Sequence, residues 1–516
     1  MTISIAGPAL SHLDSQSDVY QDLLSIAPRL AAKDHTLWGE DAQAEASIRL
    51  NWVDLPTASR ELLPQLDALS AWARSNNLTN IILCGMGGSS LAPEVIAKTS
   101  KKSLTVLDST DPAQVLAAVP SDFTNTVIVV GSKSGSTIET ASQRAFFTEK
   151  LVAAGLKPEN HIVIVTDPGS PLDKEARSAG LRVINADSNV GGRYSALSAF
   201  GLVPAALMGV DPSVLIDDAA AAAQTFTTAG SPAVSLATLL FTQTEQNIAF
   251  FDAGSEVPGL SDWIEQLIAE STGKNQVGRL PIVIESADSH VAGSALRIGF
   301  AGTSGDLIVT GTLGEQFILW EWVTALLSRA LKVDPFNQPN VTEAKERTNE
   351  ILSEWSDGKI HSPSPTFSTT NIDLFSTDSA DSLAGYIRAL LAHPSHYIAV
   401  MAYLHRGADD AILPIREAIA EKSGRGTTFG WGPRFLHSTG QFHKGGQHNG
   451  LFLQITADSK VDALIPAKNF SFGTLVMAQA LGDAKALEAR KFPTLRIHLK
   501  NRSAGISEIL EAINSL

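Results

Sequence analysis

Residues 81–90 read IILCGMGGSS, a short apolar run that passes directly into a glycine-rich turn. The β-branched residues at its start favour a strand, and a helical pattern begins near Leu91, immediately after the turn. A strand, a tight turn and a helix in this order form the repeating unit of a parallel sheet with crossover helices. The segment therefore predicts an α/β fold.

The same alternation continues along most of the chain. In the first half, further strands are expected at 104–107, 127–130, 162–165 and 183–185. After an alanine-rich helix expected at 217–228, strands are expected at 248–251, 282–284 and 307–309. The order of elements thus indicates two similar layers, although no sequence repeat is visible.

The ends of the chain follow other patterns. Residues 1 to about 70 have leucines at helical spacing and predict helices. Residues 357–383 are rich in Ser, Thr, Asp and Pro and predict a loop or insertion. A final αβ piece contains a strand at 495–499.

Composition narrows the class of protein. The chain has 516 residues, more than one core usually holds, and 44% of them are hydrophobic, so we expect an ordered protein of two or three domains. A formal charge of -15 argues against binding to nucleic acid or to anionic membranes, but leaves room for a local site that binds a small anion. The single cysteine, Cys84, lies in a predicted strand, where we interpret it as a core residue, and it indicates a reducing compartment. No stretch is long and apolar enough to span a bilayer, so we expect a cytoplasmic protein.

A second loop strengthens the case for an anion. Residues 131–140 read GSKSGSTIET and again join a strand to a helix. One hydroxyl is enough to cap a helix, whereas this loop brings together Ser132, Ser134, Ser136 and Thr137, with Lys133 among them. We therefore predict a phosphate site here, with Gly88 and Ser89 of the first turn beside it. No G-K-[ST] follows at P-loop spacing, which disfavours hydrolysis of nucleoside triphosphates.

Two other interpretations of the first turn stay open. Asp108 lies about 20 residues beyond the turn, as in a dinucleotide-binding fingerprint. The turn could also be tight without binding a ligand.

Three further segments complete a pattern that resembles a known family. They read GGRYS at 191–195, ESTGK at 270–274 and DPFNQPNV at 334–341. Together with GMGGSS at 85–90 and SKSGSTIET at 132–140, they resemble, in the same order, the motifs of the glucose-6-phosphate isomerases. That family is built from two sugar-isomerase (SIS) domains.

The resemblance implies a domain plan. It predicts a helical lead-in over 1–70, a first SIS domain over 71–230 and a second over 231–420, with a C-terminal αβ extension over 421–516. Each SIS domain would be a flavodoxin-like αβα layer with a mostly parallel sheet. The substrate would lie at the carboxyl ends of the strands.

The resemblance also implies a reaction, the isomerisation of an aldose and a ketose through a cis-enediol(ate). Glu270 would be the base that moves a proton between C1 and C2, and Arg193 would stabilise the negative oxygen of the enediolate. Lys345, seven residues after Gln338, would take part in ring opening. Neither a metal nor a cofactor is expected. The partner would be a small sugar phosphate, and the usual assembly of the family implies a homodimer.

One departure from the family concerns ring opening. Where the best-known members have Gln-His after a glycine turn, this sequence has Glu315-Gln316. Lys345 alone, Glu315, Gln316 or another histidine could fill the role. The nearest variant is the isomerase half of actinobacterial transaldolase–isomerase fusions, which similarly carry a late motif like STGQFHKGG at 438–446.

The late motif leads to a hypothesis about His443. A histidine titrates in the useful range, so His443 could take over proton transfer. Two alternatives stay open: a metal site formed by His437, His443 and His448, and a structural loop with Lys444 solvated. For the whole protein, the alternatives are an isomerase of another phosphorylated or acidic sugar and a sugar-phosphate-binding SIS regulator without catalysis.

Overall fold

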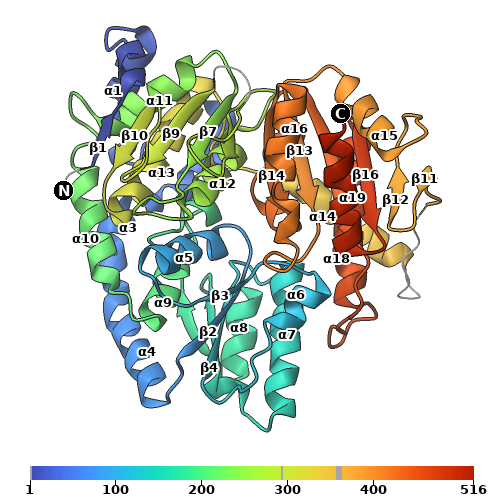
Figure 1. Cartoon of the computed structure of the whole chain (residues 1–516). Helices are drawn as coiled ribbons and strands as arrows, with labels where there is room; N and C mark the ends of the chain where they lie inside the picture. The colour runs from blue at the N-terminus through green and yellow to red at the C-terminus, as the bar shows by residue number, and fades with distance from the viewer. Residues whose placement is uncertain (1–2, 292–294, 356–362) are drawn as a thin grey trace.

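The computed structural model describes residues 3–291, 295–355 and 363–516. Figure 1 shows three sheets, each surrounded by helices and each built mainly from a different part of the chain. Most neighbouring strands are parallel, so the predicted α/β class is confirmed. The third sheet is larger than the C-terminal extension that we expected.

The first sheet is wholly parallel and has the order β3-β2-β4-β5-β6. Its strands are β2 (Asn80–Gly85), β3 (Thr105–Leu107), β4 (Thr126–Gly131), β5 (Ile162–Thr166) and β6 (Arg182–Asn185). All the strands predicted in this half are confirmed. β4 and β5 are buried along their whole length, which explains their unbroken runs of Val and Ile. The helices of this layer are α5 (Gly88–Thr99), α6 (Pro112–Ala117), α7 (Ile138–Ala153), α8 (Pro171–Ser178) and α9 (Ala199–Leu207).

The second sheet has the order β1-β10-β9-β7-β8, with only β1 antiparallel. Its strands are β1 (Ser4–Ala6), β7 (Asn247–Phe251), β8 (Leu280–Val283), β9 (Leu296–Phe300) and β10 (Leu307–Thr310). The predictions for β7, β8 and β10 are confirmed. β9 was not predicted, because Arg297 and Gly299 interrupt its apolar run.

The helices around the second sheet include α10 (Pro212–Ala223), α11 (Pro232–Thr242), α12 (Leu260–Thr272) and α13 (Leu313–Leu331). α10 is the alanine-rich helix, and it begins earlier than predicted because the Asp211 side chain caps it by accepting from the Ser213 N–H. α13 is the centre of the largest core, since every residue from Leu313 to Ser328 is buried. The N-terminal helices α1 (Asp18–Ala31), α2 (Gln43–Arg49), α3 (Leu55–Ala58) and α4 (Leu63–Ser75) pack into the same core.

The third sheet has six strands in the order β11-β12-β16-β15-β13-β14. They are β11 (Phe367–Ser368), β12 (Ile372–Phe375), β13 (Tyr397–Ala402), β14 (Gly426–Trp431), β15 (Gly450–Ala457) and β16 (Thr494–Leu499). Its helices are α14 (Pro339–Glu354), α15 (Leu383–Ala392), α16 (Ile415–Ser423), α17 (Gly440–Gly445), α18 (Phe472–Ala489) and α19 (Arg502–Asn514).

Two sequence expectations differ from this sheet. The segment 357–383 is not only a loop, because β11 and β12 form there, and β12 pairs antiparallel with β16; residues 356–362 lie outside the described residues. β11, β12 and β13 also fall within 231–420, the range expected for the second SIS domain, yet they belong to the third sheet. β16 confirms the strand predicted at 495–499.

None of the helices in the described ranges is both long and apolar enough to cross a membrane.

Candidate active site

A cavity of about 270 Å³ lies at the carboxyl ends of β2 and β4, between the first sheet and segments that follow much later in the chain. Carboxyl ends of parallel strands are the usual place for a ligand in such sheets. The lining includes Met86, Gly87, Gly88, Ser89, Gly131, Ser132, Lys133, Ser134, Thr137, Gly192, Arg193, Ser195, Phe200, Gln266, Glu270, Gln338, Lys345 and His437. The structure thus brings together most of the predicted site residues.

The predicted phosphate loop forms one wall of the cavity. It joins β4 to α7, whose first N–H groups have no partners within the helix. The Ser132 hydroxyl accepts from the Gly135 N–H at 3.2 Å, and the Ser134 and Ser136 hydroxyls lie 2.6 Å apart. Ser132, Ser134 and Thr137 line the cavity, whereas Ser136 lines a smaller pocket beside it. Hydroxyls and free N–H groups at a helix start suit a phosphate.

Lys133 anchors this loop to its neighbours. Its Nζ donates to Asp167 Oδ1 at 3.0 Å and to the Val190 carbonyl at 2.8 Å. Burial lowers the pKa of the Lys133 ammonium, although the carboxylate of Asp167 acts in the opposite direction. Lys133 therefore lines the cavity while it also holds the ends of β4, β5 and the 188–191 turn together.

The glycine turn after β2 allows a close crossing of two chain segments. A Cβ on Gly88 would lie 1.9 Å from the Gly192 carbonyl oxygen, so only glycine fits there. The Ser89 hydroxyl donates to the Met86 carbonyl and accepts from the Met86 N–H, each at 3.0 Å, which stabilises the turn. This crossing places Arg193 at the edge of the cavity.

Arg193 and Glu270 form the charged centre of the cavity. Arg193 Nη1 lies 3.2 Å from Glu270 Oε1, and the two side chains are only 4% and 11% exposed. Arg193 also donates to Ser271 Oγ at 2.8 Å and to Gln338 Oε1 at 2.9 Å. Glu270 Oε2 accepts from Gln266 Nε2 at 3.0 Å. A carboxylate and a guanidinium are thus fixed side by side in one cavity.

Lys345 enters from α14. Its side chain lines both the main cavity and a neighbouring pocket of about 90 Å³. Gln338 ends the segment before α14 and reaches the cavity through its contact with Arg193. Both side chains therefore line the cavity.

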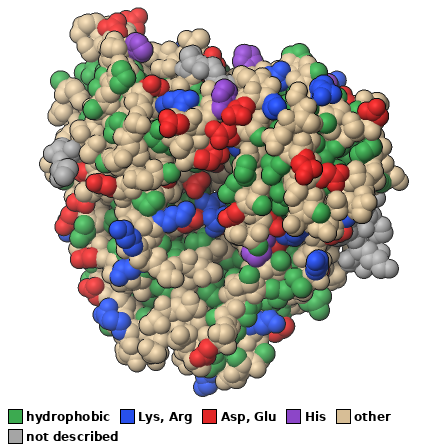
Figure 2. Space-filling view, in the orientation of Figure 1, with side chains coloured by type: hydrophobic (Ala, Val, Ile, Leu, Met, Phe, Trp, Pro, Cys, Tyr) green, Lys and Arg blue, Asp and Glu red, His purple; other side chains and the backbone are tan. Residues whose placement is uncertain are grey.

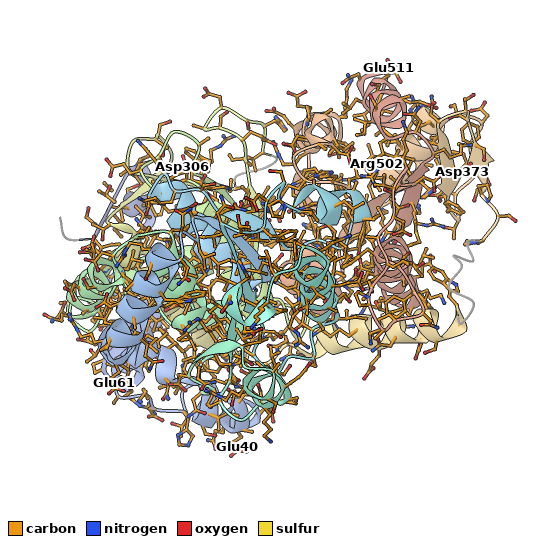
Figure 3. The ribbon with its side chains drawn as sticks, turned by 90° about the horizontal axis from the view of Figure 1, so that it is seen from below. Glu40, Glu61, Asp306, Asp373, Arg502 and Glu511 are labelled. Carbon is orange, nitrogen blue, oxygen red and sulfur yellow. The ribbon has the colours of Figure 1, made fainter. Side chains whose placement is uncertain are left out.

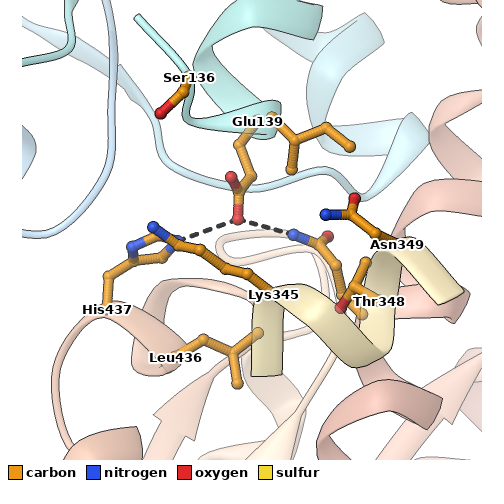
Figure 4. Close-up of a pocket in the computed structure, with 9 residues that line it drawn as sticks. Ser136, Glu139, Lys345, Thr348, Asn349, Leu436 and His437 are labelled. Atoms are coloured by element: carbon orange, nitrogen blue, oxygen red, sulfur yellow. Dashed lines mark hydrogen bonds and ion pairs between the residues drawn. The ribbon is translucent and has the colours of Figure 1, made fainter. Parts of the chain in front are cut away.

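His437 is a site residue that sequence reasoning did not select. Its Nε2 lies 3.0 Å from Glu139 Oε1, which also accepts from Gln479 Nε2 at 2.7 Å (Figure 4). Burial raises the pKa of the Glu139 carboxyl, but His437 and its hydrogen bond outweigh this and leave the pKa below its usual value. The His437 carbonyl accepts from Gln266 Nε2 at 2.7 Å. The histidine is therefore linked to the carboxylate of Glu270 through one glutamine.

Each residue of this pair lies in or beside a motif that the sequence analysis had singled out, but nothing in the sequence links the two. His437 is the first of the three late histidines, and Glu139 lies in the phosphate-loop motif. Only the packing of the third sheet against the first brings them together, which no local pattern reveals.

The hypothesis for His443 does not agree with its position. His443 is 2% exposed and lies outside the cavity lining. Its ring stacks on Tyr397 and its Nδ1 lies 3.2 Å from the Tyr397 hydroxyl. Burial, with a smaller effect of Lys444, lowers the pKa of His443 to about 3, so the ring is neutral near pH 7. His443 is a core residue here because α17 packs inward.

The rest of the late motif also has structural partners. Lys444 is buried against Asp483 and is not solvated, and His448 stacks on Phe492. Across the described ranges, no three or more His, Cys, Asp or Glu side chains gather as metal ligands would. Gln441 donates to the Gly273 carbonyl at 3.0 Å and to Asn340 Oδ1 at 2.8 Å. The motif thus joins the end of α12, which carries Glu270, to the start of α14, which carries Lys345.

Glu315 and Gln316 have structural roles at the start of α13. Glu315 Oε2 accepts from the Thr312 N–H at 2.8 Å and completes a capping box. Gln316 donates to the Val309 carbonyl and accepts from Trp320 Nε1. Neither residue lines the cavity. Cys84 is fully buried in β2, which confirms its interpretation as a core residue.

Comparison with known proteins finds similarity to glucose-6-phosphate isomerases. The family model for phosphoglucose isomerase matches residues 62–303. A probable glucose-6-phosphate isomerase of Haloquadratum walsbyi is 31% identical over 243 residues, which are 45% of this chain and 55% of that protein. The glucose-6-phosphate isomerase of Citrifermentans bemidjiense is 34% identical over 245 residues, 42% and 46% of the two chains. The match therefore spans about half the length of these relatives.

Two solved structures share the fold. A hypothetical protein of Thermus thermophilus has a TM-score of 0.58 at 23% identity, and the match covers 68% of this chain and 100% of that protein. A glucose-6-phosphate isomerase of Chlamydia trachomatis has a TM-score of 0.51 at 19% identity, and the match covers 64% of this chain and 78% of that protein. The region 62–303 that matches the family model contains the phosphate loop, Arg193 and Glu270, whereas Lys345 and His437 lie beyond it.

Proposed function

We propose, on the premise that residues 62–303 belong to the phosphoglucose isomerase family, that this chain interconverts glucose 6-phosphate and fructose 6-phosphate. The observation that carries the proposal is the Arg193–Glu270 pair, which faces the phosphate loop across one cavity. A ligand that binds its phosphate at the start of α7 would extend its other end towards this pair.

The proton transfer follows from the two side chains. Glu270 takes the proton from C2 of the open-chain aldose, and the electron pair forms the enediolate double bond. The Arg193 guanidinium stabilises the charge that develops on oxygen, because it stays protonated and is already fixed in place. Return of the proton to C1, with transfer of the hydroxyl proton from O2 to O1, gives the ketose.

Ring opening needs a second acid and base, which His437 and Lys345 supply. His437 is paired with the buried Glu139 carboxylate, an arrangement that orients an imidazole for proton transfer. Lys345 lines the same two pockets and offers an ammonium group. This assignment gives the role of the missing family histidine to His437, in place of His443, Glu315 or Gln316.

Two alternatives have less support. The phosphate loop recognises an anion more surely than particular sugar hydroxyls, so another phosphorylated or acidic sugar is the rival substrate. A sugar-phosphate-binding regulator would need neither a base beside a guanidinium nor a second acid–base pair.

The test is a coupled assay in both directions without added metal, on wild type and Glu270→Gln. We expect at least about a 100-fold loss of kcat in the variant, as for loss of a general base. Glu265→Gln is the matched control on the same helix: burial and the charge of Asp262 raise the pKa of Glu265 to about 8, so glutamine replaces a carboxyl that is largely neutral at pH 7. No turnover by wild type on either sugar phosphate, or full activity in Glu270→Gln, would refute the proposal.

The proposal includes a cytoplasmic homodimer. The lone cysteine favours a reducing compartment. Light scattering after size-exclusion chromatography should give twice the 54.6 kDa chain mass, and a monomer at micromolar concentration would contradict this part.

A further inference from the structure

A buried arginine lies three residues before His437 and ties its segment to the first sheet. We propose that Arg434 is a positioning residue, which fixes His437 against Glu139 for proton transfer; this inference rests on the function proposed for His437. Arg434 and His437 begin and end the same 3₁₀ helix, η8 (Arg434–His437). One short element therefore carries both side chains.

Arg434 is held by two carboxylates of the first layer. Its Nη1 donates to Glu94 Oε2 at 2.8 Å and to Asp108 Oδ2 at 2.9 Å. The three side chains are 10%, 11% and 2% exposed. The sequence left open that Asp108 belongs to a dinucleotide-binding site. In the structure its carboxylate binds Arg434, which follows β14 of the third sheet.

Other charges surround this triad. Arg406 Nη1 donates to Glu94 Oε1 at 2.8 Å, and Lys98 Nζ lies 3.0 Å from the same oxygen. Burial lowers the pKa of Arg434, but the negative charges of Glu94, Asp108 and Asp262 outweigh this effect. The pKa of Arg434 therefore lies above its usual value. Figure 2 shows charged side chains gathered near the centre of the face, where the three sheets meet in Figure 1. Arg434 thus stays charged and paired.

The triad connects two chain segments that both line the cavity. Glu94 lies on α5, whose first residues, Gly88 and Ser89, line the cavity. Arg434 leads within three residues to His437, which also lines the cavity and lies against Gly87 of the same turn. Burying charged side chains costs desolvation energy, so these ion pairs add little net stability to the fold. Their contribution is to fix the relative positions of α5 and η8.

The contacts of His437 explain why its position needs to be fixed. Its backbone carbonyl accepts from Gln266, which also donates to Glu270. Its ring faces Glu139 of α7, with Gln479 of α18 on the same carboxylate oxygen and Lys345 of α14 beside it. These groups come from separate elements, and Arg434 holds η8 in register with α5 and β3.

The test is a double-mutant cycle on kcat with Arg434→Met and His437→Ala. If Arg434 acts through His437, Arg434→Met lowers kcat about 10- to 100-fold in wild type, but less than about twofold when His437 is already alanine. Because Arg434 does not touch the phosphate loop, KM should change less than about threefold. Equal losses in both backgrounds would overturn the proposal.

Arg502→Met is the matched control. Arg502 (Figure 3) also joins the third layer to the first, with contacts of 2.5 Å to Asp111 and 2.7 Å to Asp409, but it lies at the start of α19, far along the chain from His437. Its substitution should lower the melting temperature and leave kcat within about twofold. A loss of kcat equal to that of Arg434→Met would show that general docking, and not positioning of His437, is responsible.

A readout independent of turnover separates this inference from the proposed function. In protein with labelled histidine, the His437 ring resonances should shift in Arg434→Met and stay unchanged in Arg502→Met. If wild type does not isomerise sugar phosphates, the proposed function fails and these resonances alone decide the role of Arg434. Unchanged His437 resonances in Arg434→Met would overturn the positioning role of Arg434. If the methionine variant does not fold, Arg434→Lys provides the same comparison.

Discussion

Substitution of His437 and of His443 should separate catalysis from stability. His437→Gln keeps an amide N–H near the position of Nε2, so Glu139 retains a donor, but the side chain no longer titrates. We expect kcat to fall about 100-fold or more, as for loss of an acid–base group. The free energy of unfolding should change by no more than about 1 kcal/mol, because one hydrogen bond replaces another.

His443→Asn should do the opposite. The amide can still reach the Tyr397 hydroxyl, but the stacking on Tyr397 and the edge contact with Phe452 are lost. We expect a loss of about 2 kcal/mol of unfolding free energy from the cavity and the lost ring contacts. The value of kcat should stay within about twofold of wild type.

The pH dependence of stability provides a second test of the position of His443. The folded-state pKa of His443 is about 3, below the usual value of 6.5, so the unfolded chain binds the extra proton as the pH falls. The stability due to neutral His443 is complete above pH 6.5 and is lost between there and about pH 3. At pH 5 the loss is about 2 kcal/mol, and His443→Asn should abolish it.

Urea unfolding at pH 7 and pH 5, with kcat measured on the same samples, tests all three statements. Two results together would refute the assignment of His437 as the acid–base group: a large loss of kcat in a His443→Asn variant that folds normally, and full activity in His437→Gln. His443 would then again be the candidate for proton transfer.

Three other substitutions test the geometry of the cavity. Arg193→Lys should lower kcat about 100- to 1000-fold, because an ammonium cannot keep the contacts with Ser271 and Gln338 while it faces the substrate oxygen. A loss of kcat below about fivefold in steady-state kinetics would contradict this. Gly88→Ala would place a Cβ 1.9 Å from the Gly192 carbonyl, so kcat/KM should fall at least about tenfold as the Arg193 segment moves; an unchanged kcat/KM would show that this crossing does not position Arg193. Gln441→Leu leaves the Gly273 carbonyl and Asn340 without their donor and should cost about 1–3 kcal/mol in urea unfolding, whereas an unchanged midpoint would argue against its bridging role.

The parts of the site that lie in local motifs could be predicted from the sequence. Glycine turns and hydroxyl-rich loops after apolar strands identify ligand-binding ends of a parallel sheet, so Gly88, Ser132 and Thr137 could be selected. Arg193 and Glu270 followed from the resemblance, and the structure places them in contact.

What the sequence did not predict depends on contacts distant in the chain. His437 and Glu139 are separated by 298 positions, and nothing near either residue indicates the other. His443 was preferred because histidine suits proton transfer, but its burial beside Tyr397 is visible only in the packed third sheet. The extent of that sheet was also underestimated, because its edge strand β11 and the neighbouring strand β12 lie in a segment of loop-like composition.

The central claim is that Glu270 moves a proton between C1 and C2 beside Arg193. The most direct measurement follows deuterium entry from D₂O into the C1 and C2 positions of the sugar phosphates by NMR. The account predicts entry with wild type and at least about 100-fold slower entry with Glu270→Gln. Deuterium entry or isomerisation as fast with Glu270→Gln as with wild type would contradict it.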